Sequence, residues 1–402
     1  MSANLATPSG RWRLIPMRPR DSEEEGRAAT PLELFFDLVF VIAVSIAAVN
    51  LHHALSEAHF WHGVTSYLVV FFAIWWAWMN FTWFATSFDT DDWLYRTVTV
   101  VQMAGVLTLA AGIGDAFEND DFAIMIAGYV LMRVAMVAQW LRASHGAGEA
   151  RRTTQIYAWG IAGLQVAWVA WLALPDGVVK TAALLALIGA ELAIPVVAER
   201  RNQTPWHPHH ITERYGLFTI IVLGESLLAS ANAIITARHD ETEIGELVPL
   251  AVLALVVTAS LWWIYFWAPH HERIGGLRQS LRYGYGHYII FAAAGALSAG
   301  IEVEIDVLTG HSELSDVVAS LCVTVPVAVF IAAVWWIVIR PHANRLVNTA
   351  VPLGALVVLV DPLIPIPIAI TTLVVVAIVV VLVLNPPRSV EGEHAPQELA
   401  EA

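Results

Sequence analysis

The sequence predicts an all-α fold, a polytopic bundle of about twelve transmembrane helices. Three observations predict it: the composition, the length of the apolar runs and the distribution of arginine. The 402 residues are 57% hydrophobic and 14% charged, with a mean hydropathy of +0.63. A water-soluble domain with an ordinary surface does not reach this balance, so we expect lipid to be the solvent of the fold.

Apolar runs recur along the whole chain, and many extend for about 18 residues or more, enough to cross a hydrocarbon core about 30 Å thick. Breaks at charged and Pro/Gly-rich joints give segments near 33–55, 62–87, 94–114, 121–142, 154–174, 177–198, 211–237, 245–268, 281–303, 315–339, 343–360 and 364–384. The joints beside Pro341 and at 362–367 are the least defined, because proline can start, kink or end a helix. A total of eleven or thirteen helices is left open.

Arginine and lysine alternate between the two sides of this arrangement, as the positive-inside rule requires. The arginines of one side are Arg11, Arg13, Arg18, Arg20, Arg27, Arg142, Arg151, Arg152, Arg200, Arg201, Arg273, Arg278, Arg340 and Arg345. The opposite loops hold only Lys180 and Arg238. We therefore expect both termini in the cytosol, with 1–30 as a cytosolic segment free of an apolar signal-peptide core and 386–402 as a disordered tail.

The two halves of the chain, 31–200 and 201–385, show weak internal similarity. Glu33 aligns with Glu213, Trp75-Trp76 with Trp262-Trp263, and Arg142 closes one segment as Arg340 closes another. Because each half has an even number of helices, both enter the membrane in the same direction. We predict a six-plus-six parallel repeat.

The composition also excludes several classes of function. The net charge is −14, but the acidic residues lie in short loops rather than in one patch, so no nucleic-acid partner is expected. The single Cys322 lies in an apolar run, which excludes a disulfide framework and a cysteine metal site. No cofactor is expected.

Two carboxylates, Glu33 and Asp37, lie four residues apart in the first segment and therefore on one helix face. Acids inside a membrane span need a partner or water. For Glu33 the simpler alternative is a position at the helix N-terminus, where its charge meets the helix dipole favourably.

The strongest functional candidate is Glu225, which lies twelve residues beyond Glu213, about 18 Å further along the helix and near the middle of the bilayer. A charged carboxylate there costs roughly 3 kcal/mol, so it must be neutral, paired or hydrated. The alternative is a protonated acid that hydrogen-bonds to a neighbouring helix and serves only structure.

The intramembrane arginine, Arg133, cannot lose its proton, so it needs a carboxylate partner. Asp37, Glu191 and Glu225 are the candidates. Such a buried ion pair could be functional or merely structural.

Acidic residues also gather after the second segment, on the side rich in arginine. Asp89, Asp91 and Asp92 precede Arg96 in this group. They could bind a cation, hold Arg96 or gate a channel mouth, while a capped, solvated helix start at Asp92 is the default interpretation.

Histidines and tryptophans give weaker signals. His207, His209 and His210 are candidate zinc ligands, but neither HExxH nor a cysteine spacing accompanies them, and protonation near pH 6.5 is an equally simple use. The Trp pairs at 75–76, 262–263 and 335–336 suggest a binding platform, although aromatic belts at the membrane interface explain most of the seventeen Trp.

Three phrases together resemble the bacterial low-temperature-requirement A family, with similarity from about residue 28 to 385. They are LELFFDLVFV (32–41), FDTDDWLYR (88–96) and TERYGLFTIIVLGES (212–226). The matching positions are Glu33, Asp37, Asp89, Asp91, Asp92, Arg96, Glu213, Arg214, Gly224 and Glu225. The resemblance implies a multi-pass bacterial inner-membrane protein linked by name to growth in the cold, without a settled activity. The pattern FxDxVF in the first segment is also faintly similar to a six-helix potassium-channel family, but Phe36 replaces its serine.

The function that these features favour is a transporter or channel for a small solute or cation, with a pathway between the two halves. Glu33, Asp37, Glu191, Glu213 and Glu225 are the predicted pathway carboxylates, Arg133 is their counter-charge, and Asp89, Asp91, Asp92, Arg96 and Arg214 form a cytosolic polar cluster. A membrane-embedded enzyme acting on lipid and a non-transporting sensor are the alternatives. The expected partners are membrane lipid and the transported species, and homo-oligomerisation is left open.

Overall fold

The computed structural model describes residues 14–24, 26–200, 202–239, 244–364 and 368–388, which contain helices and no strand. The helices are α1 (Pro31–Ser56), α2 (Phe60–Phe88), α3 (Trp93–Ala111), α4 (Ile113–Glu118), α5 (Ala123–Ser144), α6 (Arg151–Leu172), α7 (Val178–Glu199), α8 (Pro208–His239), α9 (Ile244–Tyr265), α10 (Leu277–Leu308), α11 (Asp316–Val334), α12 (Arg345–Val358) and α13 (Ala369–Leu384). Since the short α4 continues α3, the prediction of an all-α bundle of twelve helices is confirmed. The disordered tail predicted from 386 lies mostly outside the described residues.

Within these ranges, nine helices are long and apolar enough to cross a membrane. The helices α12 and α13 are apolar but shorter, with 14 and 16 residues. The remaining long helix, α6, has 22 residues and begins with two arginines, which lower its hydropathy. The chain is therefore a multi-pass membrane protein, as the composition predicted.

The described chain forms two compact units. Unit 1 comprises Met1–Ile46 and Phe72–Arg214, and unit 2 comprises Ala47–Phe71 and Tyr215–Ala402. The helices α1, α2 and α8 thus each contribute residues to both units. The predicted six-plus-six repeat with a boundary at residue 200 stays a prediction.

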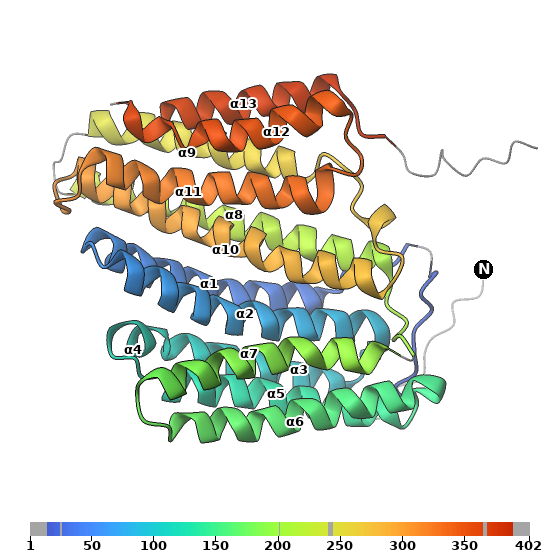
Figure 1. Cartoon of the computed structure of the whole chain (residues 1–402). Helices are drawn as coiled ribbons and strands as arrows, with labels where there is room; N and C mark the ends of the chain where they lie inside the picture. The colour runs from blue at the N-terminus through green and yellow to red at the C-terminus, as the bar shows by residue number, and fades with distance from the viewer. Residues whose placement is uncertain (1–13, 25, 201, 240–243, 365–367, 389–402) are drawn as a thin grey trace, which may run out of the picture. The chain divides into compact units, whose positions relative to one another are not determined.

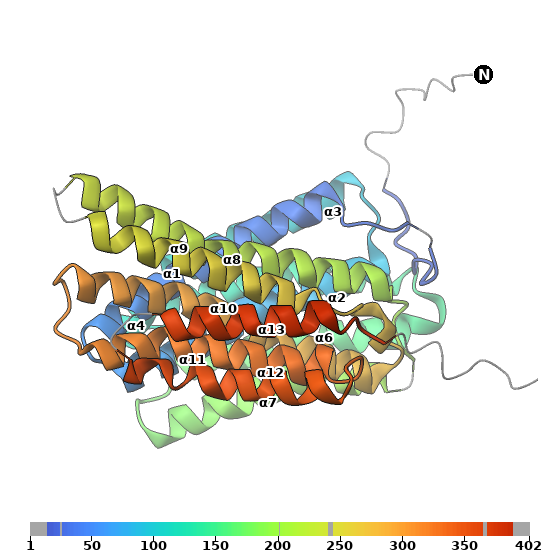
Figure 2. The ribbon, with the colours of Figure 1, turned by 90° about the horizontal axis from the view of Figure 1, so that it is seen from above.

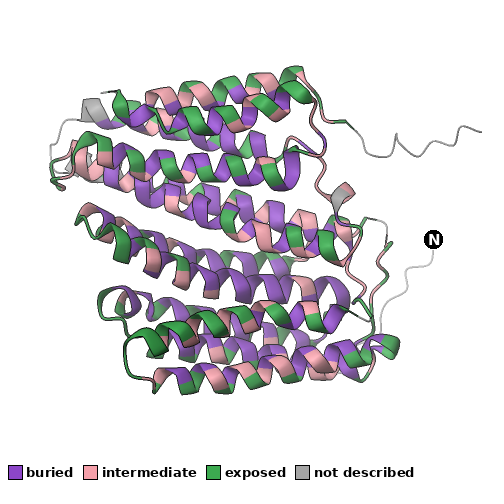
Figure 3. Ribbon diagram, viewed as in Figure 1, coloured by how far each residue is buried: buried purple, intermediate pink, exposed green. Residues whose placement is uncertain are grey.

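Glycines allow close helix packing in unit 1, where α3 packs on α5, α5 on α6 and α6 on α7; the four helices lie in the lower part of Figure 1. A Cβ atom on Gly128 of α5 would lie 2.2 Å from the backbone nitrogen of Leu109 in α3. Because no side chain fits there, glycine permits the backbones of α3 and α5 to touch. The outer helix, α7, buries few of its residues and leaves the others exposed or half-buried, as Figure 3 shows, which is expected for a helix that faces lipid.

A similar contact joins α10 and α11 in unit 2. A Cβ atom on Gly300 would lie 2.2 Å from the carbonyl oxygen of Cys322. Pro326 lacks the N–H that would bond this carbonyl within α11, so the Cys322 carbonyl is turned toward α10 instead. Beyond α11, the helices α12 and α13 lie side by side, and α13 packs on α9 (Figures 1 and 2).

The segment before α1 folds against one end of unit 1, where α1, α3, α6 and α8 begin and α2, α5 and α7 end. We call this the polar end. The backbone N–H of Arg20 donates to the carbonyl of Ser87 (2.9 Å), and Met17 is buried. Arg27 donates to the carbonyls of Thr86 (2.5 Å) and Ala85 (3.1 Å). Both carbonyls lie in the last turn of α2, where that of Ala85 also accepts from the N–H of Asp89 (3.1 Å), so Arg27 caps this end of the helix.

Candidate functional site

The start of α1 explains why Glu33 lies where it does. Thr30 and Glu33 form a reciprocal cap: Thr30 N–H donates to Glu33 Oε2 (2.8 Å), and Glu33 N–H donates to Thr30 Oγ1 (3.3 Å). Pro31 fills the first helical position, where a missing N–H costs nothing. The simpler interpretation of Glu33, a role at the helix N-terminus, is therefore correct, although it describes only one of the two sets of contacts that this carboxylate makes.

The same carboxylate belongs to a buried ionic cluster with Asp37 from α1 and Arg214 from α8. Arg214 Nη2 lies 2.6 Å from Asp37 Oδ1 and its Nε lies 3.1 Å from Asp37 Oδ2, so this pair is bidentate. Arg214 Nη1 lies 3.0 Å from Glu33 Oε1, an ion pair that lacks hydrogen-bond alignment. All three side chains are at most 1% exposed. Trp78 of α2 completes the shell by donating from Nε1 to Asp37 Oδ1 (2.7 Å).

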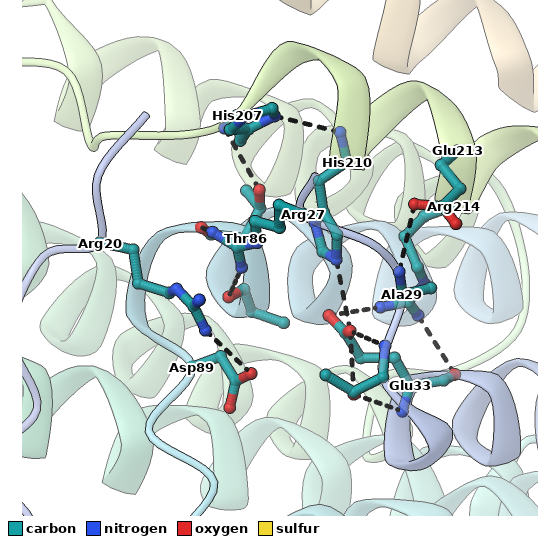
Figure 4. A network of polar contacts seen from close by, with 12 residues as sticks. Arg20, Arg27, Ala29, Glu33, Thr86, Asp89, His207, His210, Glu213 and Arg214 are labelled. Atoms are coloured by element: carbon teal, nitrogen blue, oxygen red, sulfur yellow. Dashed lines mark hydrogen bonds and ion pairs between the residues drawn. The ribbon is translucent and has the colours of Figure 1, made fainter. Parts of the chain in front are cut away.

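His210 joins this cluster one turn before Arg214. Its Nε2 lies 3.3 Å from Glu33 Oε2, and its side chain is fully buried. Figure 4 shows His210 and Arg214 approaching Glu33 from the same helix. We call Glu33, Asp37, His210 and Arg214 the Arg214 cluster. With His210 neutral, its formal charge is one arginine minus two carboxylates, or −1, and protonation of His210 brings it to zero.

A cavity of about 780 Å³ lies beside this cluster at the polar end, within the range of about 300–1,000 Å³ found for ligand sites. Its lining includes Glu24, Arg27, His207, His209 and Glu213. Glu213 Oε2 accepts from the backbone N–H of Ala29 (3.1 Å), which fixes the segment just before α1. The cavity therefore reaches Glu213, the residue that precedes Arg214 in α8.

His207 links the cavity to the cluster. Its Nδ1 accepts from the backbone N–H of His210 (3.3 Å), so its Nε2 is left to donate to the carbonyl of Glu24 (3.0 Å). Burial and the nearby charges of Arg27, His209 and His210 lower the pKa of His207, although the bond to Glu24 opposes them. His207 is thus neutral in this arrangement.

A second buried ionic centre lies deeper in unit 1, where Arg133 of α5 pairs with Glu191 of α7 (2.9 Å). Of the three partners that the sequence offered for Arg133, the structure selects Glu191. The Glu191 carboxylate also accepts from Trp76 Nε1 (2.9 Å), Tyr129 OH (3.0 Å) and Trp168 Nε1 (3.2 Å). We call these five residues the Glu191 cluster.

Arg133 is not fully satisfied by this arrangement. Its Nε and Nη1 are buried without a hydrogen-bond partner, as is Oε1 of the neighbouring Gln165. Unpaired polar groups at this depth are costly, so they mark a position suited to water or to a polar solute.

The cytosolic polar cluster predicted at 89–96 divides into two parts. Asp92 caps α3 by accepting from Tyr95 N–H (2.9 Å), and it also pairs with Arg142 at the end of α5. Burial opposes its ionisation, but the bond from Arg142 and the backbone donors keep its pKa below the usual value. The default interpretation, a helix cap at Asp92, is therefore correct, although this cap is buried rather than solvated.

The other members of the predicted polar cluster, Asp89, Asp91, Arg96 and Arg214, lie in different surroundings. Burial, followed by repulsion from Glu33, raises the pKa of Asp89, whose carboxylate lies 3.5 Å from Arg20. Asp91 and Arg96 form an exposed pair (2.7 Å). Arg214, which was predicted to belong with them, lies instead between Glu33 and Asp37.

The remaining predicted residues stand apart. Glu225 lies in α8 within unit 2 and is half-buried. His209 is exposed, whereas His210 faces Glu33, so the three histidines do not converge. Across the part of the chain that the structure describes, no group of three or more His, Cys, Asp or Glu could hold a metal ion, and this includes the weak zinc candidates His207, His209 and His210.

Sequence reasoning missed the aromatic donors. Trp75 and Trp76 are at most 2% exposed, so the interfacial-belt interpretation is wrong for this pair. Trp76 and Trp78 donate to Glu191 and Asp37. A signal existed, since all three Trp lie in the middle of a predicted span, far from either membrane interface.

The model of the bacterial low temperature requirement A protein (LtrA) family matches residues 28–384. The chain belongs to the LtrA family. An uncharacterized protein of Rhizobium meliloti (strain 1021), RA0937, is 28% identical over 260 residues, which are 61% of this chain and 60% of that protein. The LtrA chain thus spans less than two thirds of this relative's length, and no solved structure matches it.

Proposed function

We propose that this LtrA protein is a transporter or channel for a small solute or cation, with the Arg214 cluster as its ionisable centre. One observation carries the proposal: two buried carboxylates, Glu33 and Asp37, share a single guanidinium. Burying charge is expensive, and an excess of one negative charge in a membrane span is more expensive still. Binding a proton or another cation would neutralise this excess.

The cavity supports the proposal because it provides access to the centre. The carboxylates of Glu23, Glu24 and Glu213 line it together with Arg27, and Glu24 is paired with Arg20 (2.6 Å), which leaves one carboxylate in excess. This excess of negative groups attracts cations to the entrance. At the wall of the cavity, His207 Nδ1 accepts from the backbone N–H of His210, whose imidazole Nε2 lies 3.3 Å from Glu33 Oε2, so the cavity lining is linked to the centre.

The Glu191 cluster provides a second polar site within unit 1, in addition to the Arg214 cluster. Its unpaired Arg133 donors would be satisfied by water or by the solute. Glu225, which sequence reasoning favoured, is retained in the proposal as a further carboxylate on α8. Together these groups are typical of transport proteins, in which ionisable residues inside spans mark the solute pathway.

The proposed location is the bacterial inner membrane, with both chain ends in the cytosol. The distribution of arginine supports this orientation, since the polar end of unit 1 carries Arg20, Arg27, Arg142 and Arg151. The proposed partners are membrane lipid and the transported species.

The test is ion and proton flux into liposomes that contain the purified protein. Potassium, sodium and pH gradients are imposed in turn, and wild type is compared with empty liposomes, Glu33→Gln and Glu225→Gln. We expect flux above the empty-liposome level under at least one gradient. We also expect a decrease of about tenfold or more in Glu33→Gln, because the substitution removes the excess charge of the centre.

The matched control is Glu149→Gln, an exposed carboxylate at the same end of unit 1. Its flux should equal that of wild type. Folded protein that passes no ion under any gradient contradicts the ion-transport proposal and favours an organic solute or an enzymatic role.

A further inference from the structure

An apolar groove of about 550 Å³ lies in unit 2, among α1, α2, α10 and α11. Its lining runs from Leu55 and Phe60, near the joint between α1 and α2, to Tyr288 and Val329. Ala292, Ala293 and Ala296 form part of its lining on α10, so small side chains leave room above that helix. The volume falls within the range of about 300–1,000 Å³ found for small-molecule sites.

The groove offers almost no polar group to a ligand. Its two tyrosine hydroxyls are already engaged: Tyr67 OH donates to the carbonyl of Ala292 (2.8 Å), and Tyr288 OH donates to the carbonyl of Leu68 (2.7 Å). The same two bonds tie α2 to α10. A ligand in this groove therefore contacts carbon atoms, which suits an alkyl chain.

Charged groups lie next to one end of the groove. Leu51 and Leu55 line it, and the adjoining residues His52 and Ser56 contact acidic side chains of α10. His52 Nδ1 lies 3.0 Å from Glu302 Oε2, and its Nε2 lies 2.6 Å from Asp306 Oδ2. The side chains of His52, Glu302 and Asp306 thus form a polar group beside the groove, where α1 ends.

These charges are not balanced. Neither Glu302 nor Asp306 pairs with Lys or Arg among the described residues, so the group carries −1 with His52 protonated and −2 with His52 neutral. The two carboxylate side chains remain 26% and 24% exposed. They are therefore accessible to a positively charged group, and an ammonium is complementary to them.

We infer that the groove holds one acyl chain of a membrane phospholipid whose headgroup carries a primary amine, with the ammonium at Glu302 and Asp306. The apolar lining accommodates the chain, and the acidic pair selects the headgroup. This inference is independent of the proposed transport role, because none of its residues belongs to the Arg214 or Glu191 cluster.

The test is native mass spectrometry of the purified protein incubated with equal amounts of phosphatidylethanolamine and phosphatidylglycerol. Wild type should retain the ethanolamine lipid preferentially. Ala296→Phe should lower its retention at least about tenfold, because the added ring occupies space that several methylene groups would fill. Glu302→Gln/Asp306→Asn should abolish the preference while keeping lipid bound.

The control is Leu373→Phe, which enlarges an apolar side chain of α13 that is 65% exposed and does not line the groove. It should behave as wild type. Equal retention of both lipids by wild type would overturn the headgroup assignment, and unchanged retention by Ala296→Phe would overturn the groove.

Cys322 offers a second readout that needs no substitution. It lines the groove and is the single cysteine of the chain, so a thiol reagent reports on this position alone. Adding phosphatidylethanolamine to delipidated wild type should slow alkylation of Cys322 about tenfold, since a bound chain covers the thiol. An unchanged rate contradicts the inference.

Discussion

The indole Nε1 of Trp78 donates a hydrogen bond to Asp37 Oδ1 at 2.7 Å, and both side chains are fully buried. This bond holds Asp37 in place while Arg214 engages both of its oxygens. These three donors fix the Asp37 carboxylate between Trp78 and Arg214, and Glu33 shares the same arginine.

Removing the arginine should destabilise the protein strongly. We expect Arg214→Gln to lower the free energy of unfolding by about 3–5 kcal/mol, because it leaves Glu33 and Asp37 buried without a cation. Thermal unfolding in detergent measures the change. Adding Asp37→Asn to Arg214→Gln should recover part of the loss, whereas purely additive losses would show that the two residues do not interact.

The Glu191 cluster should behave as one unit. Glu191→Gln replaces a carboxylate that accepts several hydrogen bonds with an amide. The amide nitrogen is itself a donor, so it cannot accept from the donors that surround Glu191. Arg133→Met removes the positive charge of the pair. A double-mutant cycle should give a coupling energy of at least about 1 kcal/mol. A coupling energy near zero would mean that the 2.9 Å contact contributes nothing to stability.

The cap at the end of α2 should matter more than a surface ion pair. Arg27→Gln removes two charged hydrogen bonds to the carbonyls of Ala85 and Thr86, so we expect a loss of about 1–3 kcal/mol in unfolding free energy. The control is Arg96→Gln, which breaks the exposed pair with Asp91 and should change little. Equal losses in both variants would contradict the capping role.

Acidification should weaken unit 2 through His270, in the joint between α9 and α10. Burial lowers the pKa of His270 to about 4, against the bond to the Tyr265 carbonyl, which raises it. Because the folded state binds the proton less tightly than the unfolded chain, the stability that His270 contributes is complete above pH about 6.5 and is lost toward pH about 4.

Unfolding temperatures at pH 7.5, 6 and 5 measure this effect. His270→Asn should flatten the dependence on pH between 6.5 and 4, and the exposed His59 provides the control in His59→Asn. An unchanged pH dependence in His270→Asn would assign the acid sensitivity to other groups.

The helices were predictable because lipid imposes simple rules on sequence. A long apolar run can only be a helix when every backbone group must bond within its own segment. The least predictable parts were short or proline-bounded: α12 and α13 have 14 and 16 residues, shorter than most spans. At Pro326 hydropathy predicted the span but not the turned carbonyl of Cys322, which depends on Gly300 of another helix.

The sequence predicted the acidic residues of the site better than it predicted the residues that pair with them. The spacing of Glu33 and Asp37 predicted a shared face, and Arg133 was correctly expected to need a carboxylate. Arg214 was misplaced among the loop residues because it directly follows Glu213, whose neighbours at the start of α8 are polar. Which residue faces which helix depends on helix rotation, and a nearly uniform apolar sequence does not record it.

The most direct test of the ionisable centre is the initial rate of flux in liposomes that contain equal amounts of folded wild type, Asp37→Asn and Glu149→Gln. Asp37→Asn keeps the size of the side chain and removes one of the two carboxylates that share Arg214. We expect its rate to fall about tenfold or more while Glu149→Gln retains the wild-type rate. Equal rates in all three proteins would contradict a role for the Arg214 cluster in transport.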